Sequence, residues 1–240
     1  MDHAIILAAG KGTRLGALTE TRPKPMLDLH GQPLIERIIR HLASCGVRKI
    51  GINLCTMGEQ IRQHLGDGSR LGVEISYSIE DTLRGTAGSL PAFRDWLGNA
   101  EDVLVIYGDI LTDQDLLPLQ ELHQREAAFA TLLVHQRQGS NSFLLLDAGG
   151  RVSDFIERPS ESEREALLAT GQQFYVNSAL QILSRRALDE IANSAAFDLP
   201  RDLYIPRLAN ERIFALPLSG RRVAIDSEDR YHQALAMVAS

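Results

Sequence analysis

Cysteine is scarce in this chain of 240 residues, which contains only Cys45 and Cys55. No Cys-x-x-Cys pair occurs, and no secretory leader precedes the first apolar segment. We therefore expect two reduced thiols and a cytoplasmic protein. Long apolar runs are also missing. None approaches the roughly 18 residues that a membrane span requires, so we expect no contact with a membrane interior.

Positive charge is in deficit, with 25 Lys and Arg against 31 Asp and Glu and a formal net charge of −6. Because the basic residues form no long run, a general nucleic-acid or membrane-surface binder is excluded. Aromatic residues make up 5% of the chain, and Trp96 is the single tryptophan. That supply is too small for an aromatic cage around a quaternary ammonium ligand.

The chain does contain alternating strand and helix patterns. Short apolar runs at 4–8, 50–54, 73–79 and 103–107 alternate with helical spacing at 34–42 and 61–65. This order predicts an α/β fold with a mostly parallel, doubly wound, Rossmann-like sheet in a three-layer sandwich. Later runs predict added antiparallel strands at 129–135, 142–146, 152–156 and 174–183, and a last helix at 228–238. The length fits one domain, residues 1–240.

A glycine loop with two cations follows the first predicted strand. Gly10 and Gly12 allow the main chain to approach a ligand and to point its N–H groups at anionic oxygens. Arg14 adds a planar fork of donors and Lys24 a compact charge, which together suit a polyphosphate. Prolines on both sides of Lys24 stiffen its backbone. The loop therefore predicts a phosphate site.

Two other phosphate loops differ from this one in spacing. The P-loop has the form Gly-x4-Gly-Lys-Ser/Thr, whereas here a lysine lies between the glycines. The dinucleotide fingerprint requires a third glycine where Leu15 stands. It also requires an acidic residue at the end of the second strand, which here ends in Asn53-Leu54-Cys55.

The stretch Leu7-Ala8-Ala9-Gly10-Lys11-Gly12-Thr13-Arg14-Leu15 and the later Pro23-Lys24-Pro25 resemble the signature of the sugar-1-phosphate nucleotidylyltransferases. Gly85-Thr86-Ala87-Gly88-Ser89-Leu90 is similar to the family segment that opens a helix against the nucleotide base. The resemblance implies the nucleotide-diphospho-sugar transferase type of fold, with a nucleotide-binding part at 1–128 and a sugar-binding part and C-terminal helix at 129–240. The nucleotide-binding residues that it implies are Leu7, Ala8, Ala9, Gly10, Gly12, Thr13, Glu80, Gly85, Thr86 and Ala87.

Asp109 follows the apolar run 103–107, at the sheet edge where ligands of open α/β sheets bind. A carboxylate there needs a partner or a cation to offset its desolvation. The alternative is an N-cap or turn aspartate for a helix within 113–126. In the family that the chain resembles, Gly-Asp after this strand binds magnesium, which implies that Asp109 is a ligand of Mg²⁺. That ion prefers one or two carboxylates beside phosphate oxygens.

A second metal ligand is expected near the C-terminus. The family ending puts Ala224 where a metal-binding aspartate belongs, and the carboxylate stands instead at Asp226. Ile225-Asp226-Ser227 is similar to the ending of cytidylyltransferase relatives, so we expect Asp226 to reach the same ion. Two alternatives stay open: Asp226 caps the last helix with Asp229 at its third position, or one carboxylate suffices.

The segment Glu157-Arg158-Pro159 resembles the family's Glu-Lys-Pro. The resemblance implies that Glu157 accepts sugar hydroxyls and that Arg158 meets the sugar phosphate. Asn177 matches the family's Asn-Ala-Gly, but Ser178 and Ala179 replace the small pair, which narrows the expected sugar pocket. The alternative for Glu157 and Asn177 is ordinary polarity on an exposed strand face.

These parts imply that a sugar 1-phosphate oxygen attacks the α-phosphorus of a nucleoside triphosphate and releases pyrophosphate, with Arg14 and Lys24 as catalytic cations and Mg²⁺ as cofactor. Segments 64–72 and 77–80 look like the mannose, heptose and N-acetylmuramic acid branch, and GTP with a mannose- or heptose-type 1-phosphate is the preferred pair. That activity would place the chain in nucleotide-sugar biosynthesis for cell-surface polysaccharides. Uridylyl or cytidylyl transfer and a non-catalytic sensor are the alternatives, and a homodimer is compatible with the sequence.

Overall fold

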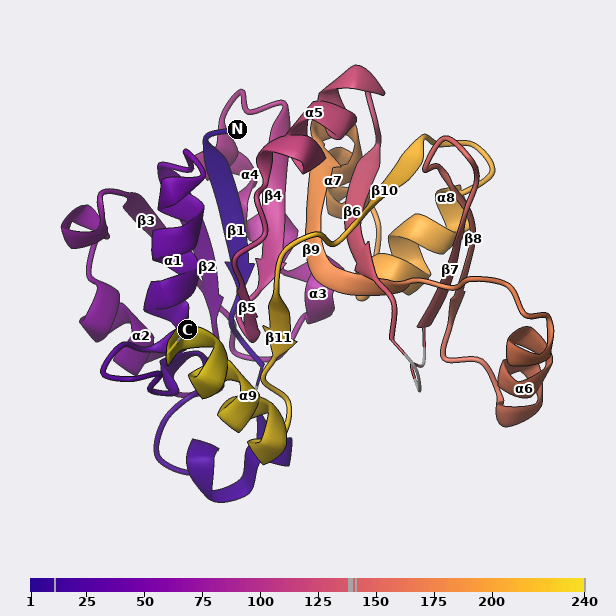
Figure 1. Cartoon of the computed structure of the whole chain (residues 1–240). Coiled ribbons are helices and arrows are strands. Elements are labelled where there is room, and N and C mark those ends of the chain that lie inside the picture. Colours follow the sequence, from indigo (N-terminus) through magenta and orange to yellow (C-terminus); the bar gives the residue numbers. More distant parts are fainter. Residues whose placement is uncertain (11, 138–139, 141, 240) are drawn as a thin grey trace.

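A seven-stranded sheet with the strand order β10-β6-β9-β4-β1-β2-β3 forms the centre of the molecule (Figure 1). We describe it from a computed structural model that covers residues 1–239 except 11, 138–139 and 141. Only β9 runs antiparallel to its neighbours within this sheet, and the other pairings are parallel. The prediction of a mostly parallel sheet with added antiparallel strands is confirmed.

The strands of the main sheet are β1 (His3–Leu7), β2 (Lys49–Leu54), β3 (Glu74–Ile79), β4 (Asp102–Tyr107), β6 (Ala130–His135), β9 (Val176–Ser184) and β10 (Ile213–Pro217). Two small antiparallel pairs join β5 (Ile110–Thr112) to β11 (Arg222–Ala224) and β7 (Ser142–Leu146) to β8 (Val152–Glu157). The longer helices are α1 (Leu34–Ser44), α2 (Gly58–Leu65), α5 (Leu117–Arg125), α6 (Glu161–Ala169), α7 (Arg185–Ala192) and α9 (Glu228–Ala239). Short helices are α3 (Gly85–Gly88), α4 (Arg94–Leu97) and α8 (Ile205–Arg207).

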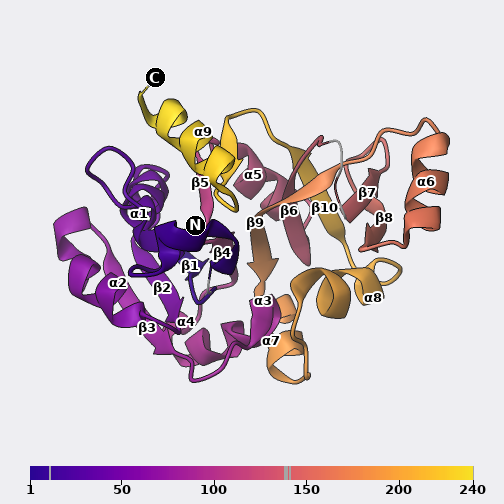
Figure 2. The same cartoon turned by 90° about the horizontal axis from the view of Figure 1, so that it is seen from below.

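Side chains of each central strand alternate between two apolar layers. Ile6 and Ile106 pack with buried residues of α1, α2 and α5, whereas Ile5 and Val105 pack with those of α3, α4 and α7. The alternation follows from the two-residue period of a strand, and it fills both faces of the sheet. Helices accordingly lie on both sides of the strands in Figures 1 and 2, which confirms the three-layer sandwich.

The C-terminal half of the chain differs from its predicted pattern in detail. The structure adds α6, α7 and the short strands β10 and β11, none of which the sequence patterns predicted. The helix expected within 113–126 begins at Leu117, because the Asp115 carboxylate accepts a hydrogen bond from the Leu117 N–H at 3.0 Å. Among the described residues, no helix combines the length and the apolar character needed to cross a bilayer.

Glu36 is a buried carboxylate on α1 that joins this helix to α2 and to the turn before β3. Its Oε2 accepts a hydrogen bond from Arg70 Nη2 at 2.8 Å, and its Oε1 accepts one from Arg40 Nη2 at 2.9 Å. His64 Nε2 lies 2.8 Å from the same Oε2. The hydrogen bond from Arg70 is the largest cause that holds the pKa of Glu36 far below its usual value, against the opposing effect of burial. Glu36 therefore stabilises the folded state in its charged form.

We expect Glu36→Gln to lower the free energy of unfolding at about pH 7 by about 2 kcal/mol, because several charge-assisted hydrogen bonds become neutral. The unfolded state of the wild type takes up a proton near the usual pKa of 4.5, while the folded state does not. The stabilisation is thus present above that pH and is lost as the pH falls below it. Urea unfolding at about pH 7 and about pH 3.5 should show the gap between the two proteins shrinking on acidification.

Glu59→Gln is the matched control on α2. Glu59 lies 3.6 Å from Arg62, and both side chains are more than half exposed. Such a pair contributes less than about 1 kcal/mol, with no comparable dependence on pH. Equal losses in Glu36→Gln and Glu59→Gln would show that the cluster around Glu36 contributes no more than an ordinary surface pair.

Candidate active site

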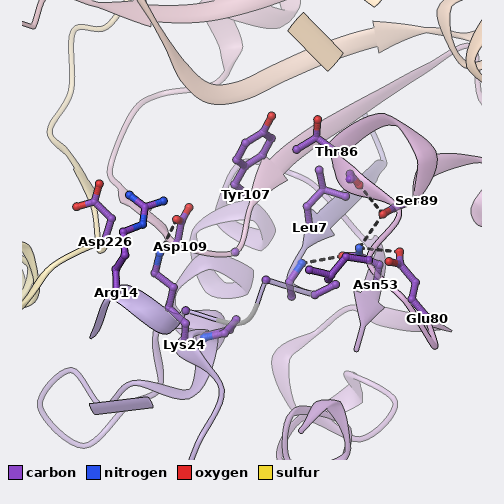
Figure 3. A pocket seen from close by; sticks show the side chains of 18 of the residues that line it. Leu7, Arg14, Lys24, Asn53, Glu80, Thr86, Ser89, Tyr107, Asp109 and Asp226 are labelled. Atoms are coloured by element: carbon purple, nitrogen blue, oxygen red, sulfur yellow. Dashed lines mark hydrogen bonds and ion pairs between the residues drawn. The ribbon is translucent and has the colours of Figure 1, made fainter. Parts of the chain in front are cut away.

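A cavity of about 540 Å³ opens at the carboxyl ends of β1, β2, β3 and β4 (Figure 3). This is the edge at which open α/β sheets bind their ligands, as the sequence predicted. The residues that line it are Leu7, Ala8, Ala9, Gly10, Gly12, Arg14, Leu15, Lys24, Pro25, Asn53, Glu80, Leu83, Gly85, Thr86, Ser89, Tyr107, Gly108, Asp109, Phe197 and Asp226. Except for Thr13 and Ala87, the structure thus brings the expected nucleotide-binding, cationic and metal-binding residues into one cavity.

The glycine loop follows β1 along one wall of the cavity. Gly12 has a φ of +64°, and an added Cβ would lie 3.1 Å from Cβ of Lys24, so glycine is required by both conformation and space. Gly10 does not adopt a left-handed conformation, and among the described residues no atom lies within 4 Å of a Cβ built there. Its contribution is open space for a ligand. Thr13 begins a 3-10 turn, and its side chain lies outside the described part of the structure.

Lys24 and Asp109 form an ion pair on the cavity wall, with Nζ 2.7 Å from Oδ2. The other carboxylate oxygen, Oδ1 of Asp109, is buried and has no hydrogen-bond partner among the described residues. A buried acceptor without a partner is costly, so this oxygen fits a cation as its missing neighbour. The alternative in which Asp109 caps the next helix is wrong, because Asp115 supplies that contact to Leu117.

Asp226 reaches the same cavity through a tight turn after β11. The Ile225 N–H donates to the backbone oxygen of Asp109 at 2.9 Å, and the Asp226 N–H donates to that of Ala224 at 3.1 Å. Ser227 provides the cap of α9, since its hydroxyl accepts from the Arg230 N–H at 3.3 Å. The alternative in which Asp226 caps this helix is therefore wrong, and its carboxylate lines the cavity instead.

Figure 3 shows the side chains of Arg14, Asp109 and Asp226 on the same side of the cavity. Within the described residues, no third acidic, histidine or cysteine side chain completes a metal-binding group. Two carboxylates are the number that Mg²⁺ accepts while it keeps positions for water and phosphate oxygens. The donor set, with its unpaired buried oxygen, therefore fits Mg²⁺.

A buried hydrogen-bond network forms the opposite wall, with Asn53 at its centre. Its Oδ1 accepts from the Ala8 N–H at 2.7 Å, and its Nδ2 donates to Glu80 at 2.9 Å and to Ser89 at 3.0 Å. The network joins the ends of β1, β2 and β3 to α3. In the sequence, Asn53 indicated only that the dinucleotide fingerprint is absent. The available signal was a polar residue at the end of an apolar strand.

The segment that begins at Gly85 is held against the chain near Phe197. Gly85 and Thr86 line the cavity, and Oγ1 of Thr86 accepts from the Leu199 N–H at 2.9 Å. Ala87 is fully buried in the apolar layer below and does not line the cavity. Its backbone N–H donates to the oxygen of Phe197 at 3.0 Å, so its contribution here is to position the segment.

The residues expected to meet the sugar lie outside the set that lines this cavity. Glu157 ends β8, and burial together with the charge of Asp198 raises its pKa. Arg158 is 67% exposed, with Nε 3.8 Å from Oε1 of Glu157. The Asn177 side chain accepts from the Ala179 N–H at 2.9 Å, within the strand itself.

The sequence matches one protein family over most of its length. Residues 3–199 match the family model described as nucleotidyl transferase. The chain belongs to this family. The match covers both walls of the cavity and the strands that carry Glu157 and Asn177, while Asp226 and α9 follow it.

The individual relatives that we compared are less than half identical to this chain. A UTP–glucose-1-phosphate uridylyltransferase from Synechocystis sp. is 30% identical over 99% of this chain, and the chain spans 63% of that protein. An N-acetylmuramate α-1-phosphate uridylyltransferase from Neisseria meningitidis is 45% identical over 47% of this chain and 48% of its own length. The crystal structure of HddC from Yersinia pseudotuberculosis complexed with GMP-PN superposes with a TM-score of 0.79 at 21% identity, covering 99% and 100% of the two chains. That superposition confirms the fold.

Proposed function

We propose that this protein is a sugar-1-phosphate nucleotidylyltransferase, which joins a nucleoside triphosphate to a sugar 1-phosphate and releases pyrophosphate. The observation that carries the proposal is the Lys24–Asp109 pair beside the glycine loop, whose second carboxylate oxygen is buried and has no hydrogen-bond partner within the part of the chain that the structure describes. A fixed cation and an acceptor suited to Mg²⁺ at one cavity wall are the requirements of phosphoryl transfer.

The catalytic roles follow from the positions of the charges. Mg²⁺ bound by Asp109 and Asp226 would neutralise charge on the reacting phosphates. Lys24, held at 2.7 Å by Asp109, keeps its ammonium at the place where charge develops on the α-phosphate. Arg14 lines the same side of the cavity and offers a bidentate fork to the leaving phosphates. The rate acceleration would come from alignment and charge stabilisation.

The first substrate pair to test is GTP with a mannose- or heptose-type 1-phosphate, because the segments 64–72 and 77–80 look like that branch. UTP is the second candidate, and the two uridylyltransferase relatives favour it. We assign nucleotide binding to residues 1–128 and sugar binding to 129–240, with Glu157, Arg158 and Asn177 on the sugar side. The two free cysteines support a cytoplasmic setting, and a homodimer is compatible with the proposal.

A substrate panel tests the proposal. GTP, UTP, ATP, CTP and thymidine triphosphate are each combined with the 1-phosphates of mannose, glucose, heptose and N-acetylmuramate in the presence of Mg²⁺. The readout is pyrophosphate, with the nucleotide sugar identified by mass. We expect pyrophosphate with at least one pair and none without the sugar phosphate. Tight nucleotide binding without pyrophosphate release in any combination would instead support a sensor.

We expect Arg14→Ala to lower kcat by about 10²- to 10³-fold, because a donor that faces developing charge is removed. The Arg14 side chain is exposed, so the melting temperature should stay within about 2 °C of the wild type. Turnover and thermal unfolding are measured on the same preparations. Parallel losses of activity and melting temperature would assign Arg14 to the folded scaffold.

A further inference from the structure

Three arginines lie near the ends of β6 and β11 and the start of α9, in the region of Asp109 and Asp226. Arg137 follows the end of β6, Arg222 lies on β11, and Arg230 lies in the first turn of α9. Burial is the largest cause that lowers the pKa of both His135 and Arg222, and the positive charges of Arg137 and Arg230 lower both further. The negative charges of Asp109 and Asp226 oppose this and raise the pKa of Arg222. The three guanidinium groups therefore act on one region, next to the proposed metal ligands.

Ser178 fixes this arginine cluster (Arg137, Arg222 and Arg230) to the sheet. Arg222 Nε donates to the backbone oxygen of Ser178 at 2.8 Å, and Nδ1 of His135 lies 2.9 Å from the Ser178 hydroxyl. The register of β6 against β9 shifts at this point, and Ala179 has a φ of +60°. At this β-bulge Ser178 is fully buried, and it directly follows Asn177, a residue of the expected sugar side.

The cluster has more positive charge than the chain itself uses. Within the described part of the chain, the two terminal nitrogens of Arg222 have no hydrogen-bond partner, and Arg230 Nη1 meets only the Gln233 amide oxygen at 3.3 Å. Burial and the arginines lower the pKa of His135 to about 4, so His135 adds no charge at neutral pH. Asp109 is already paired with Lys24. A partly buried guanidinium in this state favours an anionic ligand.

A neutral sugar 1-phosphate leaves part of this charge unmatched. Its single phosphate must lie at the α-phosphate of the nucleotide, beside Lys24, and one bidentate guanidinium completes its contacts. Arg14, which lies on the same side of the cavity as Asp109 and Asp226, is assigned to the leaving phosphates of the triphosphate. Two further guanidinium groups are therefore available to a second anionic group on the acceptor, in a chain whose net charge is otherwise −6.

We propose that Arg137, Arg222 and Arg230 form a subsite for a carboxylate on the acceptor, so that the enzyme prefers acidic sugar 1-phosphates to neutral ones. This inference rests on the proposed function and deepens it. The planar fork of arginine matches a carboxylate in two parallel hydrogen bonds, which lysine does not.

Two matched pairs of acceptors isolate the carboxylate. N-acetylmuramate 1-phosphate differs from N-acetylglucosamine 1-phosphate by a lactyl carboxylate, and glucuronate 1-phosphate differs from glucose 1-phosphate at carbon 6. We expect kcat/KM for the acidic member of at least one pair to exceed that of its neutral partner by about tenfold or more. Glucose 1,6-bisphosphate tests whether a second phosphate substitutes for the carboxylate.

The variant to compare is Arg137→Gln/Arg230→Gln, because Arg222→Gln removes a buried contact and risks misfolding. We expect it to lower the acidic-to-neutral ratio of kcat/KM by about tenfold, whereas the control Arg62→Gln on α2 keeps the wild-type ratio. Equal losses on acidic and neutral acceptors, or no acidic preference in either pair, would overturn the subsite. Calorimetric binding of the acceptors to the wild type and the variant needs no turnover. Absence of pyrophosphate in every combination would show that the proposed activity is wrong. The binding measurement tests the subsite independently of that result.

Discussion

Asp109→Asn is expected to lower kcat/KM by about 10³-fold, the largest effect on activity that the structure predicts. The amide cannot supply the charge that a divalent cation requires, and Lys24 loses the carboxylate that holds its ammonium at 2.7 Å. The fold should persist with a change of at most about 2 kcal/mol, because the amide keeps an oxygen that accepts from Lys24. Steady-state kinetics over a range of Mg²⁺ concentrations and urea unfolding measure the two quantities.

Asp113→Asn is the matched control, four positions along the chain. Asp113 pairs with Arg221 at 2.6 Å, both side chains are substantially exposed, and Asp113 does not line the cavity. We expect kcat/KM within about twofold of the wild type and a stability change of at most about 1 kcal/mol. An Asp109→Asn enzyme that keeps most of its activity would remove the observation on which the proposed function rests.

Gly85→Ala is expected to destabilise the protein by about 3 kcal/mol, the largest effect on stability that we predict from one added methyl group. Gly85 has a φ of +75°, which L residues rarely adopt, and a Cβ there would lie 2.1 Å from the backbone oxygen of Phe197. Relief of this clash requires the segments around Gly85 and Phe197 to separate. The separation would also widen the nucleotide wall, so nucleotide affinity should fall together with stability.

Gly72→Ala separates backbone strain from the clash. Gly72 has a φ of +73°, and no atom lies within 4 Å of a Cβ built there. This variant should lose only the about 1–2 kcal/mol of the left-handed conformation and should bind nucleotide normally. Differential scanning calorimetry and nucleotide titrations of both variants measure the difference. If both variants lose the same stability and affinity, the contact with Phe197 is not the cause.

The predictable half of the cavity is the half that is local in sequence. Gly12, Arg14 and Lys24 lie within one short stretch, and the carboxyl end of an apolar strand placed Asp109 at the correct edge. Only the direction of the strand is needed to predict that Asp109 lies at this edge. Asp226 lines the same cavity because of a tight turn after β11 with Ser227 as helix cap, which became visible only in the structure, and its role as a metal ligand stays a prediction.

The rest of the site depends on contacts between distant segments. Asn53 meets Ala8, Glu80 and Ser89 only because β1, β2, β3 and α3 converge. The arginine cluster depends on a β-bulge in β9 and on the pairing of β11 with β5, both of which are tertiary features without a short-range pattern. The sequence therefore predicts a strand and the polar residue at its end, but not which distant segments that residue contacts.

The antiparallel strand β9 determines whether residues 1–128 can be separated from residues 129–240. It lies in the part to which we assign sugar binding, yet it pairs with β4, in the part to which we assign nucleotide binding, from Asp102 opposite Ser184 to Ile106 opposite Leu180. A fragment that ends at residue 128 would leave β4 as an open, apolar edge that invites aggregation. A chimera that exchanges residues 129–240 between relatives must therefore carry a β9 strand that pairs with β4, so this exchange cannot change the proposed sugar-binding part without affecting the stability of the rest.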